Sequence, residues 1–225
     1  IMEVREMVND TLGGEALGIP YCTLCGSAQA FLTGRGEKRV VLRTSGLLSR
    51  SNKVMFDLET RSVFDTFRGI AKNGPLAERK VVLDQVNVIT TTWSEWRKAH
   101  PQTTVLAEAL ALGRDFDFRN TRDAKGPIFP VGSVDARLEV QEEVLGVIAP
   151  SGLPVAFPAK VAKAALLRGE NVVEAGVRLT LSAGGLLAHD SAEQDSKTPP
   201  RNLGGHLAFW FAWSQFYPET VVWTP

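Results

Sequence analysis

The chain has 225 residues, of which 44% are hydrophobic and 22% are charged, and its 25 basic residues balance 25 acidic ones. This composition excludes a disordered, collagen-like or coiled-coil protein, and a net charge of zero argues against a general nucleic-acid-binding surface. The nearest candidate for a membrane span is the apolar run at 207–213, which falls far short of the roughly 20 residues that a spanning helix needs.

The first part of the chain alternates short apolar runs with turn residues. The spacing of apolar residues at the start predicts a helix near residues 1–8, and Gly13 and Gly14 stop this pattern. Further apolar runs predict short strands at 16–21, 28–32, 39–42, 54–58 and 62–67. Residues 57–61, between two of these runs, predict a hairpin connection.

A helix over residues 92–100 is well signalled. Thr92 and Glu95 form a capping box, in which each side chain satisfies a backbone amide at the start of the helix, and a proline directly after residue 100 ends it. Trp93 and Trp96 lie three residues apart on this helix, and we expect them to be core anchors.

The second part begins after a polar, irregular stretch at 113–130, which we expect Phe116, Phe118 and Phe129 to hold in place. The sequence then predicts a hairpin of strands at 144–148 and 153–157, a helix at 159–167, strands at 177–181 and 185–189, and an exposed polar loop at 190–205.

These elements predict a β-rich α+β fold made of two related halves of short strands with a few short helices. Residues 1–112 form the N-terminal half, 113–130 an irregular connection, and 131–225 the C-terminal half, although both halves could form one compact unit. The relation rests on a faint repeat, in which 1–31 and 161–188 share the order helix, turn, strand, strand.

The most specific motif contains the only two cysteines, Cys22 and Cys25, followed by Gly26. This spacing suits half of a metal site, a redox dithiol or a local disulfide. A glycine after the second cysteine permits the tight turn of a metal knuckle, whereas redox motifs of the thioredoxin type open a helix. The residues after Gly26 do not favour a helix, so the local sequence favours the knuckle, while a structural disulfide or two buried thiols remains the plainest interpretation.

A metal at this motif would need further ligands, because structural zinc takes four. We expect His206 to be the third ligand before His100 or Met55, since Gly204 and Gly205 would let its backbone approach another segment closely. Cysteine combined with histidine or methionine favours copper or zinc over magnesium or calcium. His189, at a strand end, is expected to be solvated.

No nucleophile with a base and no acid–base pair emerges from the sequence, so we expect a binding or accessory role rather than catalysis. The alternatives are a thiol-disulfide oxidoreductase that uses the same cysteine pair and a purely structural subunit of an envelope assembly. The aromatic residues at 209–217 alternate along a strand, with Phe209, Phe211 and Trp213 on one face. Either both faces are covered within the protein, or one meets a protein partner or a membrane surface.

Several stretches together resemble one family, the uncharacterised prokaryotic proteins grouped as domain of unknown function 3179. These stretches keep the family's order and are REMVND (5–10), YCTLCGSAQAF (21–31), SGLLSRSNKVMFDLET (45–60), GPL (74–76), TTWSEWRKAHPQTTVL (91–106), VLGV (144–147) and FWFAWSQFYPET (209–220). The chain departs from the family where Arg5 replaces a common histidine, Thr23 a proline and Phe64 a tryptophan. A metal or catalytic role of that histidine is therefore in doubt in this chain.

The resemblance implies no activity, but it implies a periplasmic, secreted or membrane-anchored protein, since such proteins carry an export signal upstream. The chain opens on Ile1, and the first repeat lacks a counterpart of the hairpin at 144–157. We therefore expect a fragment of an exported precursor that lacks its N-terminal segment.

Overall fold

The computed structural model describes residues 2–34, 36, 39–107, 125–192 and 200–225, and the chain forms two compact units. The first unit contains residues 1–86 and 108–134, and the second contains residues 87–107 and 135–225. The helix predicted at 92–100 thus joins the second unit although it precedes the expected boundary at 112. Phe116 and Phe118 lie outside the described residues.

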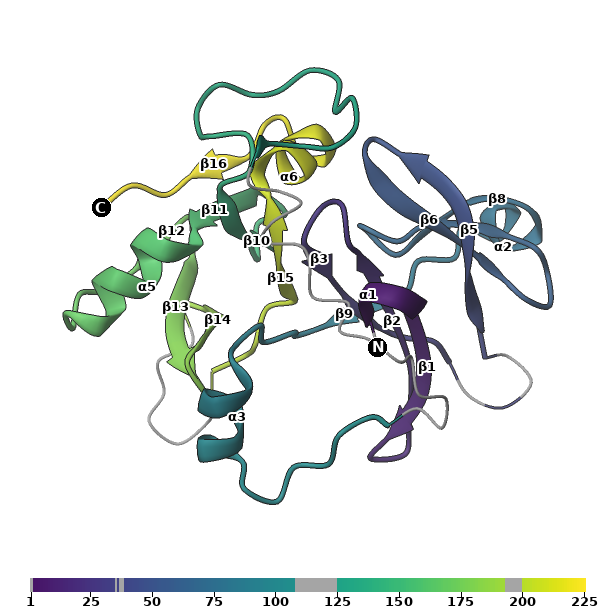
Figure 1. Cartoon of the computed structure of the whole chain (residues 1–225), viewed down its shortest axis with the longest axis horizontal. Helices are drawn as coiled ribbons and strands as arrows, with labels where there is room; N and C mark the ends of the chain where they lie inside the picture. The colour runs from purple at the N-terminus through teal and green to yellow at the C-terminus, as the bar shows by residue number, and fades with distance from the viewer. Residues whose placement is uncertain (1, 35, 37–38, 108–124, 193–199) are drawn as a thin grey trace. The chain divides into compact units, whose positions relative to one another are not determined.

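The first unit consists mainly of short antiparallel strands (Figure 1). Its elements are α1 (Met2–Arg5), β1 (Met7–Leu12), β2 (Glu15–Cys22), β3 (Ser27–Ala28), β4 (Ala30–Leu32), β5 (Leu42–Ser49), β6 (Asn52–Asp57), β7 (Val63–Asp65), β8 (Ile70–Asn73), α2 (Pro75–Glu78) and β9 (Asp84–Val86). One sheet has the order β1-β2-β4-β9, with β3 paired to β2, and the other has the order β5-β6-β7-β8. The expected hairpin at 57–61 is confirmed, because it connects β6 to β7.

The core of the first unit lies between these two sheets. Strand β2 alternates half-buried and buried residues, as expected of a strand with one face toward a core. The buried apolar cluster draws on strands of both sheets and contains Phe31, Val40, Leu42, Met55, Phe64, Ala71, Leu76 and Leu83. Burial of this cluster therefore holds the two sheets of the unit together.

The opening helix is shorter than predicted. Helix α1 ends at Arg5, and Glu6 adopts a φ of 56°, a left-handed conformation that a right-handed helix cannot contain. Residues 7–12 form β1, which pairs with β2 across a turn at Gly13 and Gly14. The cross-strand hydrogen bonds to β2 therefore decide the conformation of residues 7 and 8, which the apolar spacing assigned to a helix.

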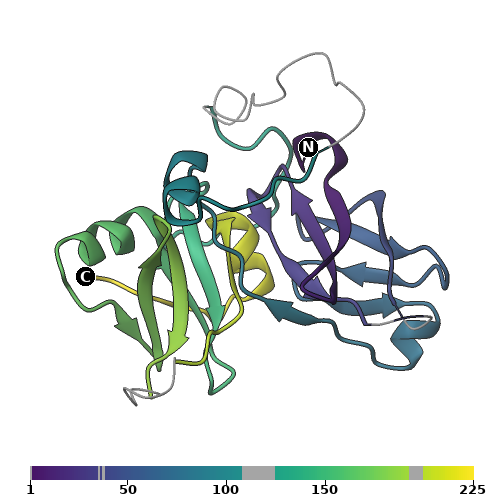
Figure 2. The same ribbon diagram turned by 90° about the horizontal axis from the view of Figure 1, so that it is seen from below.

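The second unit also combines two small sheets with short helices. Its elements are α3 (Trp93–Ala99), β10 (Glu143–Ile148), β11 (Pro154–Pro158), α5 (Ala159–Leu167), β12 (Val173–Glu174), β13 (Val177–Ser182), β14 (Gly185–Asp190), β15 (Gly205–Phe209), α6 (Trp210–Phe216) and β16 (Val221–Val222). The sheets have the orders β15-β10-β11-β16 and β12-β13-β14, and only the β11–β16 pairing is parallel among the described strands. Helix α5 packs against strands of both sheets, β10 and β11 of the first and β13 and β14 of the second (Figure 2).

The aromatic segment near the C-terminus is not the single strand that its alternation suggested. Strand β15 ends at Phe209, and residues 210–216 form α6, in which Trp210, Phe211 and Trp213 are all buried. The indole N–H of Trp210 donates to the Asp135 carbonyl at 2.8 Å, which satisfies its polar group. The segment therefore offers no exposed aromatic face. The aromatic side chain that follows it, Tyr217, is half-buried.

The capping box of α3 is confirmed, because the Glu95 amide donates to the Thr92 hydroxyl at 3.2 Å and the Glu95 carboxylate accepts from the Thr92 backbone N–H. The expectation that Trp93 and Trp96 anchor a core is wrong. Helix α3 buries none of its residues, and Trp93 is 53% exposed. The pair was assigned to a core from residue type alone, whereas only the Glu95 side of the helix packs on the unit.

The structure shows a β-rich fold with short helices, as the sequence predicts. The order helix, hairpin, strand occurs as α1-β1-β2-β4 and again as α5-β12-β13-β14. The remaining elements differ, because β5–β8 follow the first series whereas β15 and α6 follow the second. None of the described helices is long and apolar enough to cross a membrane.

Candidate functional site

The two cysteines lie on a tight turn between two strands, as the motif predicts. Cys22 ends β2 and pairs with Ser27 of β3, so residues 23–26 form the connection. The Cys25 amide donates to the Cys22 carbonyl at 3.2 Å, and Gly26 has a φ of 61°. A residue with a Cβ adopts this left-handed conformation only at a cost, which explains the glycine after the second cysteine.

The turn brings the two sulfur atoms together in a buried place. The Cys22 and Cys25 Sγ atoms are 2.7 Å apart, and the side chains are 2% and 0% exposed. Both are free cysteines in this structure. The sulfurs can therefore share one proton, one bond or one ion after a small rotation of either side chain.

A second hairpin of the same unit supplies polar partners to this pair. The turn between β5 and β6 contains Arg50 and Ser51, whose φ values are 48° and 71°. The Cys25 thiol can donate its one proton to the Ser51 carbonyl at 2.7 Å, or to Cys22 when that sulfur is a thiolate. The neighbouring Asn52 accepts a hydrogen bond from Ser27 at 3.1 Å, so two contacts fasten the β5–β6 turn to the cysteine turn.

The surroundings separate the pKa values of the two thiols. Burial alone would raise the pKa of Cys22, but hydrogen bonds from the Cys25 thiol and from the backbone N–H of Lys53, Cys25 and Leu24 lower it. Burial raises the pKa of Cys25 well above its usual value, and the hydrogen bond and negative charge of Cys22 raise it further. Cys22 is therefore the first of the pair to become a thiolate.

A salt bridge lies beside the turn. The Lys53 ammonium is 2.5 Å from the Glu6 carboxylate, and the other oxygen of Glu6 accepts a hydrogen bond from Thr23 at 3.1 Å. The positive charge of Lys53 opposes the rise in the pKa of Cys25. The Glu6 carboxylate, at the residue directly after α1, therefore links Thr23 of the cysteine turn to Lys53 of β6.

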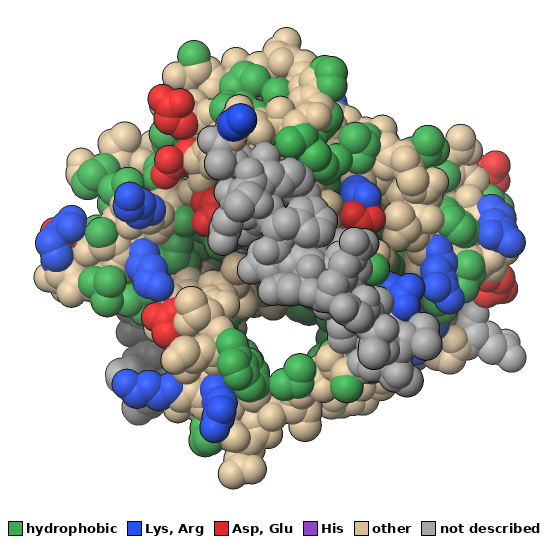
Figure 3. Space-filling view, in the orientation of Figure 1, with side chains coloured by type: hydrophobic (Ala, Val, Ile, Leu, Met, Phe, Trp, Pro, Cys, Tyr) green, Lys and Arg blue, Asp and Glu red, His purple; other side chains and the backbone are tan. Residues whose placement is uncertain are grey.

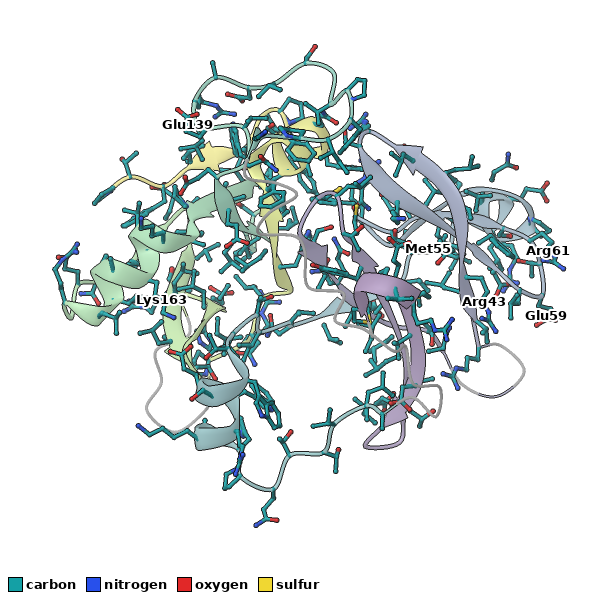
Figure 4. The ribbon with its side chains drawn as sticks, viewed as in Figure 1. Arg43, Met55, Glu59, Arg61, Glu139 and Lys163 are labelled. Carbon is teal, nitrogen blue, oxygen red and sulfur yellow. The ribbon has the colours of Figure 1, made fainter. Side chains whose placement is uncertain are left out.

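The other predicted ligands lie elsewhere. Met55 packs in the core of the first unit with Leu42 and Phe64, and Figure 4 labels it on β6. His100 follows the last residue of α3, and its ring is tilted by 40° against that of Trp96, with centroids 4.3 Å apart. No three His, Cys, Asp or Glu side chains form a potential metal-binding group in the part of the chain that the structure describes.

His189 and His206 both belong to the second unit and are buried rather than solvated. The Nε2 of His189 is 2.7 Å from the Thr180 hydroxyl. His206 lies on β15, edge-on to the Trp213 ring at 5.7 Å between centroids. Its role as the third ligand of a metal stays a prediction.

Burial lowers the pKa of His206 to about 3, which predicts acid sensitivity. The unfolded chain, with a histidine pKa near 6.5, binds this proton below pH 6.5, whereas the folded chain binds it only near pH 3. The contribution of unprotonated His206 to the free energy of unfolding is therefore fully present above about pH 6.5 and is lost as the pH falls toward 3. We expect the free energy of unfolding to fall by about 2 kcal/mol between pH 7 and pH 5 on this account.

Urea unfolding at both pH values would measure this loss. The His206→Asn variant should lose less stability over the same interval, because asparagine does not titrate. An equal loss in both proteins would assign the acid sensitivity to other groups.

Sequence reasoning missed Ser51 and Lys53 as neighbours of the cysteine pair. The run Ser49-Arg50-Ser51-Asn52 between two apolar runs does signal a turn. No local signal shows that this turn lies against residue 22, because the contact joins segments that are 26 or more residues apart.

The comparisons with known proteins identify a family and nothing closer. A family model described as "Protein of unknown function (DUF3179)" matches residues 1–220. No curated protein and no solved structure matches the chain.

Proposed function

The chain belongs to the DUF3179 family of proteins of unknown function, and from its cysteine turn we propose that it is an extracytoplasmic binding protein that holds copper(I) between Cys22 and Cys25. The observation that carries this proposal is the meeting of the two sulfurs, 2.7 Å apart, in a buried turn where backbone N–H groups lower the pKa of Cys22. Such N–H groups stabilise a thiolate, which is the form of cysteine that binds metal.

The ligand set favours a soft ion that needs few ligands. Two thiolates are soft donors, and copper(I) accepts such a pair, whereas structural zinc takes four ligands. Binding would replace the two thiol protons by one cation and release both protons to solvent. The complex would carry one net negative charge, which the Lys53 ammonium beside the turn would offset in part.

The direct test is a titration of the full chain with copper(I) under reducing, oxygen-free conditions against a chromophoric chelator of known affinity. We expect one ion per chain and a tighter apparent affinity at higher pH, because both thiols must lose their protons. Binding of no ion, or of several ions with equal affinity, would contradict the proposal.

The second candidate is a thiol–disulfide pair at the same turn. The 2.7 Å separation of the sulfurs favours it, since a bond of about 2.05 Å needs only a small closure. Exchange with a large protein substrate is disfavoured, because both side chains are at most 2% exposed. Alkylation of the denatured protein directly on cell lysis, followed by mass measurement, would separate the two states: a disulfide leaves both sulfurs unalkylated.

The extracytoplasmic location is part of the proposal and is supported by the resemblance to exported proteins. The accessory role is supported by the site itself, because a pair of buried thiols offers no open place for a substrate. Fractionation of cells that express the full-length natural protein would test the location, and recovery in the cytoplasm would contradict it.

We also infer that the two units contain copies of one ancestral segment. Each copy opens with a helix, which is followed by a hairpin of two strands. The two-residue turn of each hairpin has both residues in the left-handed conformation, at Gly13–Gly14 and at Ala175–Gly176. Antiparallel pairing of the next strand then follows in each copy. Significant similarity between profiles built separately from 2–32 and 160–190 in many relatives would support the duplication, and its absence would contradict it.

A further inference from the structure

Helix α3 presents an aromatic and basic face that its own unit covers only in part, at Trp96. Residues at helical spacings of three, four and seven share one side, which groups Trp93, Trp96, Arg97 and His100 into what we call the α3 face. Trp93 is 53% exposed, and α3 contains no buried residue. Figure 3 shows hydrophobic and basic side chains next to each other over α3, at the lower left.

The opposite side of α3 fixes the helix to the second unit. Glu95 lies 3.7 Å from the Lys163 ammonium of α5, which Figure 4 labels. The same carboxylate lies over the bare backbone of Gly184, where an added Cβ would be 2.3 Å from its Cδ atom. A hydrogen bond of 2.7 Å from Thr91 to the Ala183 carbonyl joins the two segments again. These contacts hold the α3 face in a fixed direction away from Gly184.

The charges near α3 favour an anionic partner. Arg97 and Lys98 are exposed in the last turn, and neither has an ion pair among the described residues. Glu95, the carboxylate of the helix, is already paired with Lys163. Arg97 shares the α3 face with the Trp93 indole, whereas Lys98 follows Glu95 by three residues and lies nearer the opposite side. The segment continues to Val105 and Leu106, which are 66% and 48% exposed.

We propose that the α3 face docks the protein on an anionic phospholipid surface. Indole rings prefer the boundary between lipid headgroups and acyl chains, because their apolar body and N–H group suit the two environments. Lysine and arginine near a bilayer attract anionic headgroups, and this attraction weakens as salt is added. An exposed tryptophan beside Arg97 on one fixed helix, with Lys98 exposed in the same last turn, matches both requirements.

Sedimentation of the full chain with lipid vesicles tests this docking. One set of vesicles contains phosphatidylcholine alone, and the other contains equal parts of phosphatidylcholine and phosphatidylglycerol. We expect binding to the second set, a shift of tryptophan emission to shorter wavelength, and weakening by added salt. Trp93→Ala should lower the partition coefficient roughly tenfold, and the double change Arg97→Glu, Lys98→Glu should lower it by at least as much.

A matched control exists in the first unit. Leu12 is also 53% exposed, but it lies on β1 without a helix of this kind, so Leu12→Ala should leave vesicle binding unchanged. Equal binding to both vesicle sets, no binding to either, or an equal fall in Leu12→Ala and Trp93→Ala would overturn the proposal. If the face instead binds an acidic protein partner, neither vesicle set would bind the chain. Copper binding plays no part in the assay, so this proposal and that of the cysteine site fail independently.

Discussion

Replacing Cys22 with serine is expected to lower the copper(I) affinity of the protein by more than about 100-fold, because the site would lose the thiolate that its surroundings stabilise. Three backbone N–H groups and the Cys25 thiol act on Cys22. A serine hydroxyl at this position would remain protonated at neutral pH and would be a hard, weak ligand. Competition with a chromophoric chelator measures the change directly.

The two substitutions of Cys25 separate metal binding from folding. Cys25→Ser keeps a hydroxyl that can donate to the Ser51 carbonyl, whereas Cys25→Ala leaves that carbonyl without its 2.7 Å donor. Both variants should lose copper(I) to a similar extent. Only Cys25→Ala should also lose about 1 kcal/mol of stability relative to the serine variant, through the missing hydrogen bond.

Ser27→Ala provides the control beside the site. Ser27 is fully buried and pairs directly with Cys22 across the strands, so the change disturbs the same turn without removing a sulfur. This variant should bind copper(I) nearly as well as the unchanged chain. If Cys22→Ser and Ser27→Ala had equal affinities, the cysteines would not be the ligands.

The sequence was most informative where local chemistry decides the structure. Cys22, Cys25 and Gly26 specify a turn through their spacing and the left-handed glycine, and Thr92 and Glu95 specify the start of α3 through the capping box. The hairpin over 144–157 was likewise predictable from its apolar runs and the turn between them.

The missed features depend on contacts between distant segments. The helix expected through residue 8 stops at Arg5, because residues 7–12 pair with β2. The run 209–213 changes from strand to helix at Trp210, because β15 ends its pairing with β10 at Phe209. Trp93 is exposed although its type suggests a core, since only the other side of α3 packs on the unit. Such contacts leave no periodic signal in the residues concerned.

The strongest destabilisation that we expect from a single methyl group is at Gly146. This glycine lies on β10 directly under the Trp213 ring, and an added Cβ would be 2.1 Å from the ring carbons Cε3 and Cζ3. Trp213 has little room to move, because it is 1% exposed and its indole N–H donates to the Thr220 hydroxyl at 3.0 Å. We therefore expect Gly146→Ala to cost about 3 kcal/mol, the upper part of the range for overpacked cores.

Thermal unfolding would show this cost as a fall in melting temperature of roughly 10 °C for a chain of this length. Gly169→Ala is the matched control, because that glycine has a φ of 80° and no heavy atom within 4 Å of an added Cβ. Its cost comes from backbone strain alone, about 1 kcal/mol. The double variant Gly146→Ala, Trp213→Leu should lose less stability than the two single variants lose together. The smaller leucine side chain leaves the space that the added methyl group needs. Equal costs at Gly146 and Gly169, with no recovery in the double variant, would mean that the ring of Trp213 does not rest on this strand.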